Sequence, residues 1–199
     1  LNDIFKKERR AVQLMNADSI INKYDAVNPE KLLGGLYSAD EMVVDPREAL
    51  TRLPEHLEEK YDIEFEWGKC VSYVADQTVY IGNEEEHDAD LIFVCSGADF
   101  ETLYPEEYLR LPLTKCKLQM MRLASQPNEW KVGASLCGGL SLIHYNSFKA
   151  APSLAKLKQR YEEEMSEYID AGIQVMVSQN AAGELTVGYS HEYGLHCDP

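Results

Sequence analysis

The residues Asp90 to Asp99, with the sequence DLIFVCSGAD, are the stretch from which the fold is most directly predicted. Leu91 to Cys95 are five consecutive apolar residues that run straight into Ser96-Gly97-Ala98. A short apolar run bounded by turn residues is typical of a buried strand. In nucleotide-binding α/β domains such a strand often ends against a cofactor, because glycine lets the backbone approach a phosphate closely. The Gly-x-Gly-x-x-Gly fingerprint of these domains is nevertheless absent from the 199 residues.

Composition and charge exclude several classes of function. Apolar residues make up 45% of the chain, which is enough for the core of one large domain or two small ones. Acidic residues outnumber basic ones 34 to 19, and the net charge of −15 disfavours binding to nucleic acids or anionic membranes. No apolar run approaches the roughly 18 residues of a membrane-spanning helix. The five cysteines are widely spaced, so we expect buried, reduced thiols in a cytoplasmic protein and no metal site.

The periodicity of the apolar residues predicts an α+β fold with a mixed or antiparallel sheet and flanking helices. A strong helix start is Asp45-Pro46-Arg47-Glu48, because Asp45 suits the N-cap, proline the first helical position and Glu48 a capping box. Ser153 is expected to cap a further helix, and Asp18 to cap a short one. Helices are therefore expected over 3–16, over 18–25, from 46 onward and from 154 onward.

The expected strands fall into two groups. A small antiparallel meander, with an acidic turn at 83–88, is expected to lead into the buried strand 90–95, because the apolar period changes from 3.6 to 2 after Tyr61. A β-rich region follows from about residue 105 and closes with a hairpin around Asn180 to Gly183. The strands are expected at 34–44, 63–67, 71–74, 78–81, 90–95, 115–123, 131–134, 136–145, 173–178 and 184–189.

Five sequence pieces, taken in order, resemble the FAD-dependent amine and amino-acid oxidoreductases, a superfamily that includes D-amino-acid oxidase, glycine oxidase and sarcosine oxidase. The pieces are Val44 to Arg47, Gly68 to Val71, Leu91 to Ala98, Lys115 to Arg122, and Leu185 to Tyr189 followed by Asp198-Pro199. The sequences CKLQMMR, at Cys116 to Arg122, and SHEYG, at Ser190 to Gly194, are most similar to a bacterial branch associated with aminophosphonate breakdown.

The resemblance implies roles for particular residues. The backbone of Val71 is expected to receive the adenine ring of FAD, and a strand end is expected beside its ribose and pyrophosphate, formed by Cys95, Ser96, Gly97 and Ala98. His144 and Tyr145 are expected on an active-site strand, with His191 as a further catalytic group. Lys115, Lys117 and Arg122 are candidates to bind a substrate anion. Residues 1–45 and 105–199 correspond to the substrate domain, and 46–104 to part of the FAD-binding domain.

The expected function is therefore oxidation of the C–N bond of a small amine or amino acid, possibly an aminophosphonate, by hydride transfer to flavin. Because the chain starts at Leu1 inside an expected helix and ends at Asp198-Pro199, we expect an internal fragment that binds FAD only as part of its full-length parent. The alternative is a stand-alone acidic α+β binding module without flavin chemistry. The substrate, the electron acceptor and the oligomeric state are left open.

Overall fold

A computed structural model describes residues 1–83 and 85–195 and divides the chain into two compact units. Unit 1 comprises Leu1–Pro46 and Cys116–Glu192, and unit 2 comprises Arg47–Lys115 with the described residues from Tyr193 onward. Both units combine helices with antiparallel sheets, which confirms the α+β class. The second changeover between the units follows Lys115. The expected functions of these parts stay predictions.

Unit 1 begins with a helix and a two-stranded sheet. Helix α1 covers Asn2–Lys7 and is followed by β1 (Val12–Asn16), so the expected helix over 3–16 is wrong in its second half. Strand β1 pairs antiparallel with β2 (Gly34–Ser38), from Val12↔Ser38 to Asn16↔Gly34. Hydrogen bonding to a strand distant in the sequence outweighs the local helical preference of these residues.

Helix α2 (Ala17–Ile21) is shorter than expected and has a different cap. The side chain of Asn16, not Asp18, accepts the hydrogen bond from the Ser19 N–H at 2.9 Å. The helix supplies Ile20 to a small core that also contains Met15 of β1 and Tyr24. The hairpin and helix therefore stabilise one another through this cluster.

The main sheet of unit 1 has four strands in the order β6-β9-β8-β7. Strand β6 covers Lys115–Leu123, β7 Leu136–Cys137, β8 Met176–Gln179 and β9 Leu185–Gly194. The closing hairpin is confirmed, with β8 and β9 paired from Met176↔Gly188 to Gln179↔Leu185. Asn180 stabilises its turn, because its side-chain oxygen accepts from the Glu184 N–H at 3.0 Å.

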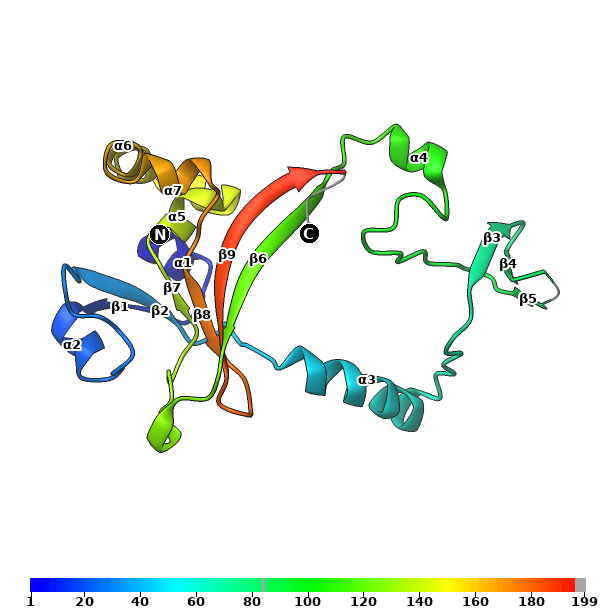
Figure 1. The fold of residues 1–199 in the computed structure, drawn as a ribbon, viewed down its shortest axis with the longest axis horizontal. Coiled ribbons are helices and arrows are strands. Elements are labelled where there is room, and N and C mark those ends of the chain that lie inside the picture. Colours follow the sequence, from blue (N-terminus) through cyan, green and yellow to red (C-terminus); the bar gives the residue numbers. More distant parts are fainter. Residues whose placement is uncertain (84, 196–199) are drawn as a thin grey trace. The chain divides into compact units, whose positions relative to one another are not determined.

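Several helices lie beside strands β7 and β8 of this sheet (Figure 1). They are α5 (Leu140–His144), α6 (Leu154–Glu164) and α7 (Ser166–Asp170), with the 3-10 turn η2 (Asn146–Ala150). A further 3-10 turn, η1 (Pro127–Glu129), lies in the connection from β6 to β7. The helix expected after Ser153 is confirmed as α6.

Two expected strands of this region are wrong. The strand over 136–145 ends at Cys137. The Gly138 N–H still donates to the Val175 carbonyl, but the Gly138 and Gly139 carbonyls accept from the N–H groups of Ser141 and Leu142 and turn the chain into α5. Residues 131–134 form no strand. The Val132 N–H instead donates to the side-chain oxygen of Gln179 at 3.0 Å, and this anchors Val132 in the core with 2% of its surface exposed.

Unit 2 contains a long helix and the expected meander. Helix α3 covers Pro46–Tyr61, as expected, and includes Pro54. Strands β3 (Val71–Ala75), β4 (Thr78–Ile81) and β5 (Glu85–Asp88) form an antiparallel sheet in sequence order, and α4 covers Pro105–Leu109. The acidic segment expected as a turn therefore forms β5. Residues 63–67 form no strand, and the rings of Phe65 and Trp67 stack instead.

The buried strand expected at 90–95 is wrong. These residues have no regular secondary structure, and 70% of Leu91 and 79% of Phe93 are exposed. A strand needs a hydrogen-bonded neighbour, and the sheet of unit 2 contains only β3, β4 and β5 among the described residues. An apolar run therefore predicts only that its residues favour burial. The segment forms a strand only where other strands flank it.

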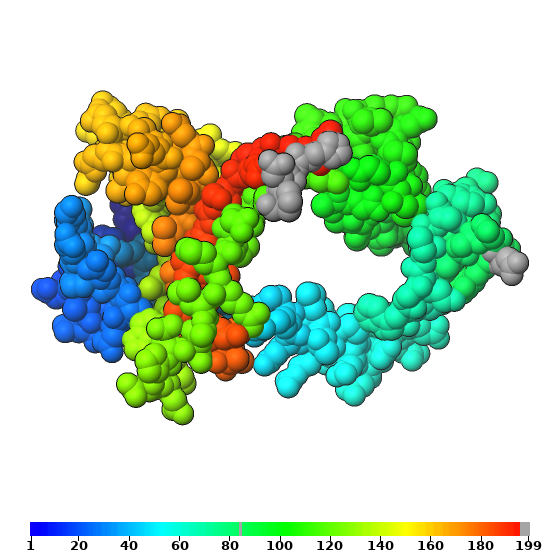
Figure 2. All heavy atoms as spheres, in the orientation of Figure 1, coloured from blue at the N-terminus to red at the C-terminus, as the bar shows by residue number. Residues whose placement is uncertain are grey.

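The chain exposes an unusually large surface. Its accessible area is 15555 Å², whereas two compact bodies of the units' sizes would together expose roughly 11,000 Å². Helix α3 has no buried residue, and other elements of unit 2 leave it uncovered on the face shown in Figure 2. Of the helices formed by the described residues, none has both the length and the apolar character required to cross a bilayer.

Candidate functional site

The three residues expected to be catalytic come together in unit 1. His144 ends helix α5, Tyr145 follows it in extended conformation, and His191 lies on β9. The expectation that His144 and Tyr145 occupy a strand is wrong, because the chain becomes helical after Gly139. The end of this helix nevertheless lies against β9, since the ring centroids of His144 and His191 are 4.6 Å apart and nearly parallel, at 26°.

Tyr189 completes this cluster and was not anticipated from the sequence. It lies two residues before His191 on β9, so both side chains occupy one face of the sheet. The two ring centroids are 4.9 Å apart, and the Tyr189 hydroxyl lies 3.1 Å from that of Tyr145. The period of two between Tyr189 and His191 is the signal from which Tyr189 could have been identified. We refer to His144, Tyr145, Tyr189 and His191 as the His–Tyr cluster.

The two phenols of the His–Tyr cluster lie close together, with Tyr189 half-buried and Tyr145 exposed. Both hydroxyls lie near the sulfur of Met176, at 3.8 Å for Tyr145 and 3.4 Å for Tyr189. The hydrogen bond with Tyr145, together with burial, raises the pKa of Tyr189 to about 12. Tyr189 is therefore a neutral phenol at physiological pH and acts as a hydrogen-bonding group rather than as a base.

The backbone of Gly172 orients His191. The His191 Nδ1 lies 2.7 Å from the Gly172 carbonyl oxygen. A carbonyl only accepts hydrogen bonds, so Nδ1 carries the proton and Nε2 is the basic nitrogen of the neutral ring. Burial, with a smaller contribution from His191, lowers the pKa of His144. The cluster thus places two imidazoles beside two phenols, with Nε2 as the nitrogen of neutral His191 that can accept a proton.

The residues expected to bind FAD lie in unit 2. Val71 is half-buried at the start of β3 and faces Ile81 across the β3–β4 ladder. The expected turn after Cys95 is present: the Asp99 N–H donates to the Ser96 carbonyl at 3.2 Å, and the Ser96 hydroxyl donates to the Asp99 carbonyl at 3.0 Å. Gly97 has φ +63°, and nothing lies within 4 Å of where a Cβ would be. Ala98 completes this open turn.

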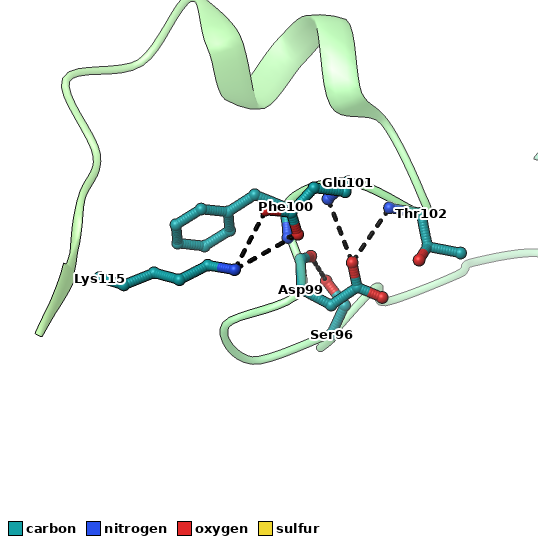
Figure 3. Close-up of polar contacts among 6 residues, drawn as sticks. All are labelled: Ser96, Asp99, Phe100, Glu101, Thr102 and Lys115. Atoms are coloured by element: carbon teal, nitrogen blue, oxygen red, sulfur yellow. Dashed lines mark hydrogen bonds and ion pairs between the residues drawn. The ribbon is translucent and has the colours of Figure 1, made fainter. Parts of the chain in front are cut away.

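Carboxylates line the side of this turn shown in Figure 3. Asp99 Oδ1 accepts from the N–H groups of Glu101 and Thr102 at 3.1 and 3.0 Å. A hydrogen bond from the Thr102 side chain, followed by these two backbone bonds, lowers the pKa of Asp99. Glu101 pairs with Lys115, whose ammonium group also lies 5.5 Å from the centre of the Phe100 ring. The described residues therefore do not by themselves fit the diphosphate of FAD, because ionised Asp99 takes up backbone donors that an anion would need.

The three candidate anion-binding cations are each engaged by a carboxylate. Lys115 pairs with Glu101, Lys117 Nζ lies 3.4 Å from Glu192, and Arg122 contacts Glu184. The four described cysteines are free thiols but are exposed, which corrects the expected burial.

A second polar cluster lies in unit 2 and involves Glu66, Lys69, Glu85 and His87. His87 Nε2 lies 3.0 Å from Glu85 Oε1 and 3.6 Å from Glu66 Oε1. The hydrogen bond with Glu85 raises the pKa of His87, and contacts with Lys69 and His87 lower that of Glu85. This cluster was not anticipated from the sequence.

Comparisons of the chain with protein-family models, with curated proteins and with solved structures gave no match.

Proposed function

We propose that this chain is the substrate-side part of a cytoplasmic FAD-dependent oxidoreductase that oxidises the C–N bond of a small amine or amino acid, such as an aminophosphonate. The single observation that carries the proposal is the His–Tyr cluster, in which His144, Tyr145 and His191 meet although α5 and β9 are far apart in the sequence. The residue pattern that resembles the amine oxidoreductases is the second support. The free thiols suit a reducing compartment.

In this proposal the residues of the chain bind the substrate and control one proton. An amine is oxidised only as the free base, so its ammonium form must first lose a proton. His191 Nε2 is the proposed acceptor, because the Gly172 carbonyl holds the proton on Nδ1. Burial lowers the pKa of His144, which disfavours a second positive charge beside the stacked ring of His191.

The two phenols would orient the substrate. Tyr145 is 37% exposed and joined to Tyr189, so its hydroxyl can reach a bound carboxylate or phosphonate while Tyr189 holds it in place. Because the described residues do not by themselves fit FAD, we assign flavin binding to the longer parent protein and derive no step through it.

The acidic turn at Asp99 favours the alternative, a binding module without flavin chemistry. The two functions are distinguished on the protein encoded by the complete gene. An oxidoreductase is expected to be yellow, and its flavin to bleach when glycine, sarcosine or aminomethylphosphonate is added anaerobically. A colourless protein that FAD does not reconstitute would contradict the oxidoreductase, and saturable binding of the same amines by that protein would support the module.

Variants test the cluster in the same protein. We expect His191→Asn to lower kcat/KM by about 10²-fold or more, the usual contribution of a positioned acid–base group. The control is His56→Asn, which changes an exposed histidine of α3. Equal activity of the two variants would remove His191 from the mechanism.

A further inference from the structure

Strand β5 places a carboxylate and an imidazole side by side. Glu85 and His87 are two residues apart on this strand, so both side chains leave the same face of the sheet. Glu66 approaches from the segment before β3, with Oε1 3.6 Å from His87 Nε2. Among the described residues, these three are the one group of three or more histidine, cysteine or acidic side chains whose possible ligand atoms lie within 4.8 Å of one another.

The distances between the three side chains suit a metal ion. A tetrahedral Zn²⁺ with ligands at about 2.0–2.1 Å separates neighbouring ligand atoms by about 3.3 Å. His87 Nε2 lies 3.0 Å from Glu85 Oε1 and 3.6 Å from Glu66 Oε1, on either side of that value. The imidazole also distinguishes this cluster from an acidic patch, because Ca²⁺ and Mg²⁺ prefer oxygen ligands whereas imidazole with carboxylates suits zinc.

Lys69 and His87 contact different oxygen atoms of the two carboxylates. Its ammonium group contacts Oε2 of Glu85 and lies 3.9 Å from Oε2 of Glu66, whereas Oε1 of each carboxylate faces His87. Lys69 thus holds the oxygens opposite to the ligand atoms, as outer partners of metal-binding carboxylates do. It also neutralises one of the two negative charges, so the ion would be attracted by a net charge of −1 when His87 is neutral.

We propose that Glu66, Glu85 and His87 form a Zn²⁺ site with three protein ligands and a fourth position open to solvent. The side chains of the three ligands are 44%, 39% and 45% exposed, so an ion can enter without unfolding the meander. Binding would join the segment before β3 to the edge strand β5 and would brace the small sheet of unit 2. The proposal is independent of the amine chemistry proposed for unit 1.

The test uses the complete 199-residue chain with its thiols alkylated, because free cysteines also bind zinc. Calorimetric titration with Zn²⁺ is expected to give one equivalent, and Co²⁺ in its place is expected to give the visible absorption of a four-coordinate ion. Glu85→Gln and His87→Gln, which each remove one ligand, are expected to weaken Zn²⁺ binding at least tenfold. Circular dichroism verifies that both variants are folded.

Glu86→Gln is the matched control. It removes the same charge from the neighbouring residue of β5, whose side chain leaves the opposite face of the strand, and it is expected to leave the affinity for Zn²⁺ unchanged. Absence of stoichiometric binding, or equal weakening by Glu85→Gln and Glu86→Gln, would overturn the proposal and leave these residues as an ion-pair network.

Discussion

Replacing Gly172 by alanine tests the packing beneath the His–Tyr cluster. Gly172 has φ +61°, and a Cβ there would lie 2.9 Å from His191 Cβ and 3.2 Å from the His191 backbone N and O. The left-handed conformation costs a non-glycine residue about 1–2 kcal/mol, and overpacking costs about 1–3 kcal/mol. We therefore expect Gly172→Ala to lower the free energy of unfolding of unit 1 by about 3 kcal/mol.

Gly133→Ala separates the cost of the left-handed backbone from the cost of overpacking. Gly133 is in the same unit and has φ +76°, but its nearest neighbour, a ring atom of Tyr24, would be at an ordinary 3.4 Å from the added Cβ. This variant is expected to lose only the 1–2 kcal/mol of conformational strain. The difference between the two variants then measures the contact with His191.

Urea unfolding followed by fluorescence gives both values. Trp130 lies in unit 1 and Trp67 in unit 2, so a Trp67→Phe background makes the signal specific to unit 1. With a slope of about 2 kcal/mol per M urea, Gly172→Ala is expected to lower the midpoint by about 1.5 M, roughly twice the effect of Gly133→Ala. Equal midpoints for the two variants would refute the close packing of Gly172 against His191, and with it the proposed orientation of that ring.

Two further predictions concern unit 1. Tyr145→Phe is expected to lower the pKa of Tyr189 from about 12 towards 10, because the hydrogen bond with Tyr145 is the main cause of the raised pKa. NMR titration of the labelled phenol carbon of Tyr189 measures this pKa, and an unchanged value would make burial the cause of the shift. Since the unfolded chain loses this proton first, the stabilisation from Tyr189 is complete below pH about 10 and is lost as the pH rises towards 12. Val132→Ala, at a residue with 2% exposure, is expected to cost about 2 kcal/mol in the urea assay. Val43→Ala, at a 56% exposed residue, is expected to cost less than about 0.5 kcal/mol, and similar losses at both positions would show that Val132 is not part of the core.

Elements specified by neighbouring residues could be predicted from the sequence. Helix α3 begins where Asp45-Pro46 indicates, and the hairpin β8–β9 turns at Asn180 to Gly183. In both cases a cap or turn sets the conformation within a few residues. Segments that depend on distant partners were predicted wrongly. Val12–Asn16 pairs with β2 instead of continuing a helix, and Leu91 to Cys95 form no strand.

The candidate site was likewise predicted only in part, because some of its contacts depend on residues far apart in the sequence. A resemblance identified His144, Tyr145 and His191, but it placed the first two on a strand. The structure has them at the end of α5, because the Gly138 and Gly139 carbonyls accept from the N–H groups of Ser141 and Leu142 and turn the chain into a helix after β7. Tyr189 could have been identified from its spacing of two residues from His191 on β9. The oxygen atoms around His87 could not be predicted, because loop approach decides which side chains meet there.

The sequence by itself determined the starts of α3 and α6, the turn between β8 and β9 and the alternation of side chains along the strands, because these depend on interactions within a few residues. Only the tertiary structure decided that His144 would stack on His191 and that Glu66 would face His87. Those contacts join segments that are independent in the unfolded chain, and they form only when sheet pairing and packing bring the segments together. The same physics explains Leu91 to Cys95, whose apolar side chains favour burial but stay exposed because no described strand flanks them.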